Sequence, residues 1–597
     1  MLIDRGLLAR QNGGWVLREL PDEFSVPDSV HAVLAARIDL LGAPEKAALQ
    51  AAAVIGRVFW TGPVYELVEA TPDLRVLEDR DFVRRRAGST MAGEREYVIK
   101  HALTREVAYE SLPRARRARM HAAFAGWLER VGRGRDDLAS LLAHHYAEAV
   151  RPEDLDLAWQ DEQDELQRLR AKALHWLESA AQLAMRRYEI EDALALLYRA
   201  LSLEPDAEAQ AEVWRAVGKA NALKFDGEAF WTAMQHSLRV CSNKATCADT
   251  YSELAFQTAI RSSMWAKRPD RELVHGWIEQ ALELSEPESD SRAKALIARS
   301  FWERNTPAAA REARELAERA GNLELRSYAL GASGAVAFGQ GDFESALAWS
   351  QRRLDVLDEI SDPDHVADIY EIAIPSYCAN ARFSEARRLA AEHDAIVEPL
   401  SDHHRVHGIA VQLEVEEACG GWDRIVDLAE RTEAAVTANL ATPCIRNARS
   451  LLLTALAAAY AGDDETARRY ERLADEVATE GYDFVLAAPR TWLALLRGEI
   501  DALERVESID LARGQTWYAL PAAAARLDAL AALKERSLVE RDATPLLQRG
   551  TYLEPFALRA LGTVRDDEAF LGEAIDRFDA IGLTWHAEQT RKLVAAA

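Results

Sequence analysis

His101 is one residue of this sequence that could take part in chemistry. It lies in the stretch Tyr97–His121, YVIKHALTREVAYESLPRARRARMH, between a strand-like run and an amphipathic helix. An imidazole at a strand-to-helix junction can donate a hydrogen bond to an anion near neutral pH. His101 is therefore a candidate phosphate contact, and the alternative is that it bonds locally and only orders the junction.

The same stretch is rich in arginine. Its arginines are Arg105, Arg114, Arg116, Arg117 and Arg119. They could contact a phosphate backbone, but a period of 3.6 disperses them around a helix, and Glu106 and Glu110 lie just upstream. We expect a solvated face, or a face that docks another domain, in preference to a DNA contact.

A second cluster of chemically capable side chains comprises Asp402, His403, His404 and His407. If this segment is helical, His403 and His407 lie one turn apart and could share a metal ion, with a third ligand supplied from a distant part of the chain. Because the cluster follows Pro399 at a predicted helix start, we expect exposed histidines here and no metal. His144, His145 and Trp176 fall in amphipathic helices, where packing is the expected role.

Known catalytic patterns are absent from the sequence. GxxxxGK[ST] does not occur, since Gly218–Lys219 lacks the upstream glycine and the following Ser/Thr, and we find no nucleophile elbow, HExxH or dinucleotide fingerprint. We predict a chain that is not an enzyme and that binds no cofactor by itself.

The cysteines show neither CxxC pairing nor zinc spacing. They are Cys241, Cys247, Cys378, Cys419 and Cys444. Buried free thiols in a reducing compartment are the prediction. No secretory leader opens the sequence and no apolar run approaches a membrane span, so we predict a cytoplasmic protein without a membrane partner.

The net charge is unevenly distributed along the sequence. Residues 1–150 hold 21 basic and 21 acidic residues, so the formal net charge of -26 falls on residues 151–597. An acidic body repels phosphate backbones, so we do not expect nucleic acid as a partner of the long C-terminal part. Any binding groove there should favour basic peptides.

From about residue 171 onward the pattern is that of paired amphipathic helices. Small residues recur with some drift in successive copies, such as Gly218 with Ala229, and Gly334 with Ala346. The turn segments GQGDF, ANARF, CGGWD, AGDDE and TVRDDE separate the helices, many of them roughly 34 to 45 residues apart. This spacing is typical of tetratricopeptide repeats, and about ten or eleven pairs should stack into a superhelix with a concave binding surface.

Residues 1–150 have a different pattern. A hairpin is predicted from LLARQ and WVLREL around Gly13–Gly14. Helices are predicted over 30–41 (with Asp28 or Ser29 as N-cap), 44–54 and 63–69, then two strand-like runs, DFVRRRAG and REYVIKH, and a helix from residue 102. Three short helices followed by a hairpin indicate a winged helix.

Two segments carry a family resemblance. VPDSVHAVLAARIDLLGAPEKAALQAAAVIGRVFW followed by YVIKHALTREVAYESLPRARRARMHAAFAGWLE resembles the region after the nucleotide-binding domain in STAND-type signalling ATPases. The likeness is to bacterial proteins that join an AAA-like ATPase to tetratricopeptide repeats, often with a class III adenylyl/guanylate cyclase domain or a LuxR-type DNA-binding domain. KHALTREVAYESL looks like the MHD-type motif of that family, with Lys100 in place of methionine and Ala102 in place of aspartate.

The resemblance implies a division of the chain and a role for each part. Residues 1–24 would be the end of an ATPase domain, 25–130 a winged helix, 131–170 a helical connector and 171–597 the repeat superhelix. His101 would sense the phosphates of ATP or ADP held by an upstream ATPase domain, the five arginines would dock that domain, and Met1 would be an internal residue of a longer protein.

The overall prediction is a mainly all-α, non-catalytic regulatory portion. It would bind a protein or peptide in the repeat groove and relay that occupancy through the winged helix. Two alternatives are a DNA-binding regulator acting through the winged helix, and part of an adenylate cyclase or other ATP-binding enzyme whose catalytic domains lie upstream.

Overall fold

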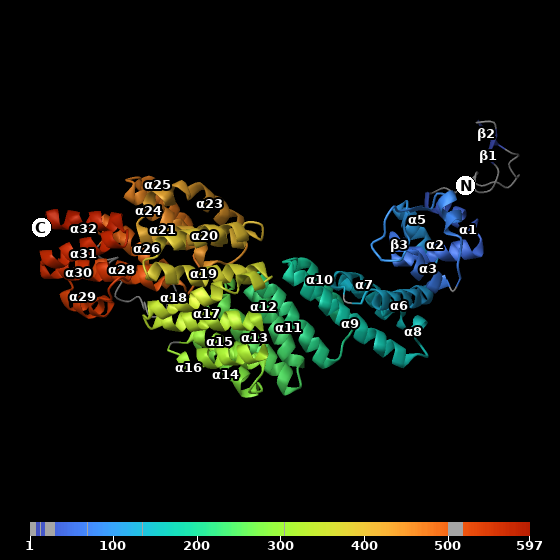
Figure 1. Ribbon diagram of the computed structural model, residues 1–597, viewed down its shortest axis with the longest axis horizontal. Coiled ribbons are helices and arrows are strands. Elements are labelled where there is room, and N and C mark those ends of the chain that lie inside the picture. Colours follow the sequence, from blue (N-terminus) through green and yellow to red (C-terminus); the bar gives the residue numbers. More distant parts are fainter. Residues whose placement is uncertain are drawn as a thin grey trace. The chain divides into compact units, whose positions relative to one another are not determined.

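The structure is a computed structural model that divides into two compact units (Figure 1). It describes residues 8–11, 14–17, 30–68, 70–133, 135–303, 305–499 and 518–596. The N-terminal unit contains the described residues up to Ala184 together with Glu191–Asp206, and the repeat unit contains Met185–Ile190 and the described residues from Ala207 onward. The fold is mainly all-α, as the sequence predicts. No described helix is both long enough and apolar enough to cross a membrane.

The N-terminal unit contains the strands of the fold. β1 (Leu8–Gln11) pairs antiparallel with β2 (Gly14–Leu17), with Leu8 opposite Leu17, which confirms the predicted hairpin strands. A three-stranded antiparallel sheet has the order β3 (Val58–Trp60), β5 (Glu96–Ile99), β4 (Val83–Arg85). β4 and β5 form the predicted second hairpin, whereas β3 was not predicted because three residues carry no readable alternation.

Four helices of this unit have predicted starts, at residues 30, 44, 63 and 102, and each begins within two residues of the predicted position. The described helices of the unit follow in chain order. They are α1 (Val30–Asp39), α2 (Ala43–Ile55), α3 (Thr61–Val68), α4 (Leu74–Asp79), α5 (Ala102–Glu110), α6 (Arg114–Val131), α7 (Ala139–Ala149), α8 (Leu155–Ala158), α9 (Gln163–Arg186) and α10 (Ile190–Ser202), with the 3-10 turns η1 (Asp136–Leu138) and η2 (Pro152–Asp154). The short helix α4 is an addition to the prediction. The proposed N-cap residues Asp28 and Ser29 lie outside the described residues.

One buried carboxylate fixes the loop between β4 and β5. Glu96 on β5 is almost fully buried, pairs with Arg86 at 2.5 Å and accepts hydrogen bonds from the Thr90 backbone N–H and hydroxyl. Burial alone would raise the pKa of Glu96, but these donors and Arg86 outweigh it and hold the pKa below its usual value. The loop is therefore tied to the sheet at its base.

The repeat unit consists of antiparallel helical pairs. Its helices are α11 (Ala207–Leu223), α12 (Gly227–Val240), α13 (Lys244–Ile260), α14 (Arg271–Leu284), α15 (Asp290–Trp302), α16 (Pro307–Ala320), α17 (Leu323–Gly339), α18 (Phe343–Leu354), α19 (Pro363–Ala379), α20 (Phe383–Val397), α21 (Asp402–Cys419), α22 (Trp422–Asp427), α23 (Ala429–Ala438), α24 (Ile445–Tyr460), α25 (Asp464–Glu476), α26 (Asp483–Arg497), α28 (Ala519–Ala532), α29 (Arg536–Ala543), α30 (Glu554–Arg565), α31 (Glu568–Ala580) and α32 (Thr584–Ala596), with the 3-10 turns η3 (Ser262–Met264), η4 (Leu357–Glu359) and η7 (Thr544–Leu546).

Each predicted turn segment joins the two helices of a pair. GQGDF lies between α17 and α18, and TVRDDE between α30 and α31. Small residues let the paired helices approach: a Cβ on Gly218 would lie 2.5 Å from Met234 Cε, and Ala346 and Ala386 are fully buried. The tetratricopeptide-type packing is thus a direct result of the glycine and alanine spacing. The first predicted pair, α9 and α10, groups mainly with the N-terminal unit.

The superhelix of the repeat unit closes on itself. Tyr482 Oη donates a 2.6 Å hydrogen bond to the carbonyl of Ser262, and Lys267 pairs with Glu480 at 2.6 Å. The Arg268 guanidinium lies over the Tyr482 ring. Helical pairs far apart in sequence are therefore neighbours in space, which the regular stacking of successive pairs does not require.

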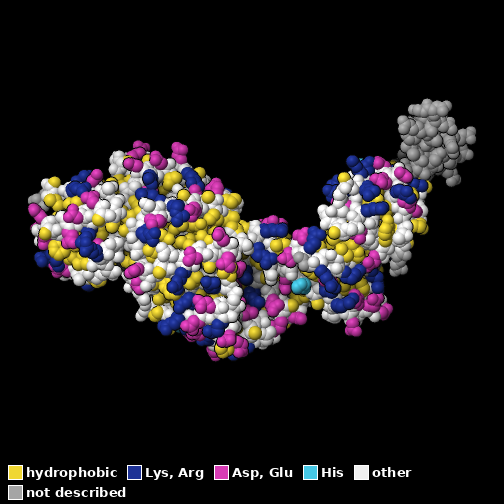
Figure 2. All heavy atoms as spheres, in the orientation of Figure 1, with side chains coloured by type: hydrophobic (Ala, Val, Ile, Leu, Met, Phe, Trp, Pro, Cys, Tyr) yellow, Lys and Arg dark blue, Asp and Glu magenta, His cyan; other side chains and the backbone are white. Residues whose placement is uncertain are grey.

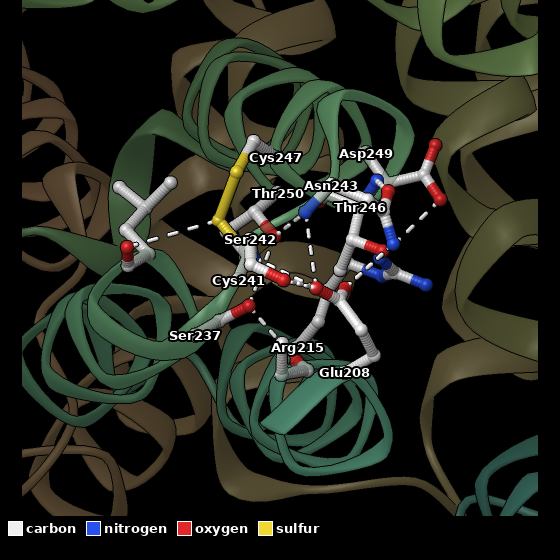
Figure 3. Close-up of a disulfide and its surroundings, with 12 residues drawn as sticks. Glu208, Arg215, Ser237, Cys241, Ser242, Asn243, Thr246, Cys247, Asp249 and Thr250 are labelled. Atoms are coloured by element: carbon white, nitrogen blue, oxygen red, sulfur yellow. Dashed lines mark hydrogen bonds and ion pairs between the residues drawn. A yellow bond between two sulfur atoms is a disulfide. The ribbon is translucent and has the colours of Figure 1, made fainter. Parts of the chain in front are cut away.

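Cys241 and Cys247 form a disulfide, so the prediction of free thiols is wrong for this pair (Figure 3). Cys241 ends α12 and Cys247 lies in the first turn of α13, and their Cα atoms are 5.8 Å apart. Glu208 accepts from the Ser242 and Asn243 backbone N–H groups at 2.8 and 3.0 Å, which fixes the same turn. No spacing pattern reveals this bond, because the thiols meet only where α12 ends and α13 begins.

The three remaining cysteines, Cys378, Cys419 and Cys444, are buried free thiols, which confirms that part of the prediction. Burial raises the pKa of the Cys419 and Cys444 thiols to about 12, so both are neutral at physiological pH unless a metal binds.

Candidate functional site

The candidate site is a pocket inside the repeat unit, with a volume of about 210 Å³. The first helices of successive pairs, α13, α15, α17, α19, α21 and α24, supply most of its wall. Its aromatic lining is Phe225, Phe301, Tyr328, Phe338 and Tyr518, and its charged or titratable lining is Arg261, Asp364, Asp368, Glu371, His404, His407 and Arg446. Because each pair contributes its inner helix, residues from almost three hundred positions of sequence meet in one place.

One side of the pocket is a buried chain of charged groups. Arg261, at the end of α13, forms an ion pair with Asp364, and the other carboxylate oxygen of Asp364 lies 3.0 Å from His404 Nε2. Burial raises the pKa of Asp364, but the Arg261 guanidinium outweighs this effect and the pKa stays below its ordinary value. Asp364 is therefore a carboxylate, and it fixes both neighbouring side chains.

Glu371, two turns after Asp364 on α19, orients a second set of side chains. Its Oε1 lies 2.7 Å from His407 Nδ1, and its Oε2 accepts a 2.5 Å hydrogen bond from Arg446. Burial would raise the pKa of Glu371, yet Arg446 and His407 hold it well below the ordinary value. This carboxylate sets the orientation of a histidine and an arginine that both line the pocket.

A third ion pair lies behind α19. Arg353 is fully buried and donates to Asp368 at 2.5 Å and to the Ser327 hydroxyl at 3.1 Å. Ser327 also lies 3.0 Å from His365 Nε2, and burial lowers the pKa of His365 to about 3. The His365 ring is therefore neutral, and Arg353 supplies the positive charge that pairs with the Asp368 carboxylate.

The charges of the pocket are therefore balanced, which does not fit the expectation of an acidic groove for basic peptides. Asp364, Asp368 and Glu371 each have an arginine partner within the described residues. On the surface, too, basic and acidic side chains are interspersed over the face of the repeat unit seen in Figure 2. The net charge of the chain is not concentrated where a ligand would bind.

The histidine cluster lies at this pocket. α21 begins at Asp402, and the Ser401 hydroxyl caps it by accepting a hydrogen bond from the His404 N–H. This confirms the helix start predicted after Pro399. The expectation of exposed histidines is wrong, because His403 and His404 are buried. Cys444 Sγ lies 3.4 Å from His407 Nε2, a partner that no local pattern in the sequence could reveal.

His101 lies in the N-terminal unit at the predicted strand-to-helix junction, between β5 and α5. It occupies the N-cap position of α5, makes no side-chain capping hydrogen bond and is exposed. The neighbouring Lys100 is paired with Asp81. The position of His101 leaves its ring free of any capping role, and its contact with a nucleotide stays a prediction.

Most of the five arginines make contacts inside the N-terminal unit. Arg105 donates to the Ala53 carbonyl at 3.0 Å, and the Arg117 guanidinium lies 4.9 Å from the centroid of the Tyr109 ring. Arg119 pairs with Glu162 at 2.5 Å, and Arg114 lies 3.5 Å from Asp154. Arg116 is exposed and forms no ion pair with any residue that the structure describes. Their role in docking another domain stays a prediction.

His145 packs in the core of the same unit, as predicted, and it also takes part in a hydrogen-bonded chain. Tyr109 Oη lies 3.0 Å from His121 Nε2, and His121 Nδ1 lies 2.8 Å from His145 Nδ1. Trp176 donates to Glu129 at 2.8 Å. These groups have a structural role that composition alone does not show.

Comparisons with known proteins give only distant likenesses. No family model matches the chain, and no curated protein matches it. A signal transduction ATPase with numerous domains that carries a tetratricopeptide repeat sensor, from Pyrococcus horikoshii, is 13% identical with a TM-score of 0.31, over 66% of this chain. The match spans 63% of that protein's chain.

Two other solved structures are repeat proteins. A tetratricopeptide repeat domain is 11% identical with a TM-score of 0.21, covering 71% of this chain and 98% of that domain. A circular tandem repeat protein is 17% identical with a TM-score of 0.15, covering 79% of this chain and 93% of its own. At these scores the assignment of the fold rests on the helical pairs themselves.

Proposed function

We propose that this chain is a non-catalytic sensing portion of a STAND-type signalling ATPase. The repeat unit would bind a ligand in its pocket. The N-terminal unit, as a winged helix, would dock the nucleotide-binding domain and relay occupancy by differential affinity for two packings. The sequence resemblance over residues 26–60 and 97–129 supports this assignment.

The main support for a sensing role is the pocket inside the repeat unit. Inner helices from many successive pairs reach it, so one occupant contacts residues from Phe225 to Tyr518 at once. A ligand that prefers one curvature of the superhelix would shift the whole unit toward that curvature. A binding site confined to one pair could not act in this way.

The size and lining of the pocket define the ligand that we expect. About 210 Å³ admits a small molecule or one or two side chains of a peptide, not a folded domain. The aromatic groups Tyr328 and Phe338 favour an apolar part, and Arg261 and Glu371 offer hydrogen bonds to both anionic and cationic groups. We therefore favour a peptide terminus or an amphiphilic small molecule.

A ligand screen on the full chain tests the sensing role. Thermal shift with a library of short peptides and metabolites should give ligands that raise the unfolding temperature of the wild-type chain. Ala335→Trp, which fills the pocket, should abolish these shifts, whereas Ala308→Trp on the exposed face of α16 should retain them. Shifts that survive Ala335→Trp would place the binding site elsewhere.

Two further measurements separate the alternatives. A DNA-binding regulator would bind duplex DNA with a steep salt dependence, so fluorescence anisotropy at low salt should show no binding if our proposal is right. Reading the genomic DNA upstream of the Met1 codon for an in-frame GxxxxGK[ST] tests the link to an ATPase domain. Nucleotide hydrolysis by the chain itself would contradict the non-catalytic assignment.

A further inference from the structure

Three potential metal ligands from two helices converge at the edge of the pocket. They are His403 and His407, one turn apart on α21, and Cys444, the N-cap residue of α24. Cys444 Sγ lies 3.4 Å from His407 Nε2, and the two imidazole centroids are 4.4 Å apart. One ligand atom from each residue lies within 4.8 Å of the other two. Three atoms at these separations can surround a single ion.

His403 supplies an independent sign that a group is bound there. Its side chain is 3% exposed, and neither ring nitrogen has a hydrogen-bond partner in the part of the chain that the structure describes. The Phe225 ring stacks on it at a centroid distance of 3.7 Å and shields one face. Buried polar groups are almost always satisfied, so an unpaired imidazole that lies beside two other potential ligands points to a bound group.

His407 is oriented as a metal-binding histidine would be. Its Nδ1 lies 2.7 Å from Glu371 Oε1, and Arg446 fixes the other oxygen of that carboxylate at 2.5 Å. When Nδ1–H donates to Glu371, the lone pair of Nε2 points toward Cys444. Such a carboxylate–histidine pair fixes the tautomer and makes the ligating nitrogen more basic.

A simple hydrogen bond between Cys444 and His407 would explain only part of this arrangement. Arg446 Nη1 lies 2.9 Å from His407 Nδ1, so the other tautomer could accept from Arg446 and donate to the sulfur. That arrangement leaves both nitrogens of His403 buried and unpaired. A metal ion would instead bind the Cys444 sulfur, His407 Nε2 and one nitrogen of His403 together.

We propose that His403, His407 and Cys444 bind a transition-metal ion of the zinc class, with Glu371 as a positioning residue. Two imidazoles and one thiolate are ligands that Zn²⁺ prefers. Binding converts the Cys444 thiol to a thiolate and releases its proton to solvent. Because His407 also lines the pocket, the fourth position is filled by water or by an atom of the pocket's occupant.

Cobalt titration of the full chain, stripped with a chelator, tests the site directly. One equivalent of Co²⁺ should produce a thiolate-to-cobalt absorption band in the near ultraviolet, and Zn²⁺ should displace it. Cys444→Ser should abolish the band, and His403→Gln should weaken binding at least tenfold. The matched controls are Cys378→Ser and His586→Gln, since Cys378 is another buried free thiol and both His586 nitrogens are also buried and unpaired.

A second measurement needs no variant and covers the case in which the substitutions disturb folding. X-ray absorption at the zinc edge of the loaded wild-type chain should show two imidazole nitrogens and one sulfur at about 2.3 Å. The proposal is overturned if the wild-type chain gives no thiolate band at one equivalent. It is equally overturned if the band persists in Cys444→Ser or if the zinc spectrum contains no sulfur.

Discussion

Tyr482 donates its hydroxyl proton to the carbonyl of Ser262, 220 residues earlier in the chain, at 2.6 Å. Ser262 lines the pocket and Tyr482 is the N-cap residue of α26, so this bond ties the wall of the candidate site to a helical pair far along the chain. The closure of the repeat unit at Tyr482 therefore supports one part of the pocket wall.

Tyr482→Phe should loosen this closure without unfolding the repeats. Loss of one neutral hydrogen bond costs about 1 kcal/mol, which corresponds to a roughly fivefold faster amide exchange over residues 261–268. Tyr470→Phe is the control, because it removes a 3.2 Å bond to Glu433 between adjacent pairs. Hydrogen exchange with mass spectrometry should show the change only in Tyr482→Phe, and equal exchange in both variants would contradict it.

Gly562 tests the small-residue packing that the repeat pattern predicts. A Cβ there would lie 3.0 Å from the backbone nitrogen of Leu571 on the paired helix, so Gly562→Ala forces α30 and α31 apart. We expect a loss of about 1–3 kcal/mol in urea unfolding followed by circular dichroism. Gly276 on α14 has no atom within 4 Å of such a Cβ, so Gly276→Ala should stabilise by up to about 1 kcal/mol. A loss in both variants would remove the packing explanation.

The disulfide predicts a thiol count and a stability difference. Chain purified in air without reductant should show three reactive thiols in denaturant, and five after reduction. Closing a loop with a sequence separation of 6 stabilises by about 2 kcal/mol in the chain-entropy account, so Cys241→Ser should lower the unfolding midpoint. Five reactive thiols before reduction, in chain that was never exposed to reductant, would show that the bond does not form.

These features differ in how far the sequence could predict them. The helical pairs were predictable because glycine and alanine spacing and turn residues act within about forty residues. The contact of Tyr482 with Ser262 could not be predicted, because its geometry depends on the small rotations between many successive pairs. The approach of Cys444 to His407 could not be predicted for the same reason. The sequence predicts an exposed His403 because it follows Pro399 at a helix start, whereas Phe225 from another pair covers its ring.

His121 predicts acid sensitivity of the N-terminal unit. Burial lowers its pKa to about 3, with a further contribution from His144 and Arg105, whereas an unfolded histidine has a pKa near 6.5. Below about pH 6.5 the unfolded chain binds a proton that the folded chain does not. The stability contributed by the neutral ring is therefore full above that pH and is lost, by about 1.4 kcal/mol per pH unit, as the pH falls toward 3.

Thermal unfolding at about pH 7.5 and about pH 5.5 measures this loss. His121→Gln should show a smaller difference between the two midpoints than the wild-type chain, even if its stability at the higher pH is reduced by weaker bonding to Tyr109 and His145. His175→Gln is the control, because His175 is exposed on α9 of the same unit and should retain the wild-type difference. If His121→Gln retains it as well, the acid sensitivity has its origin in another buried group.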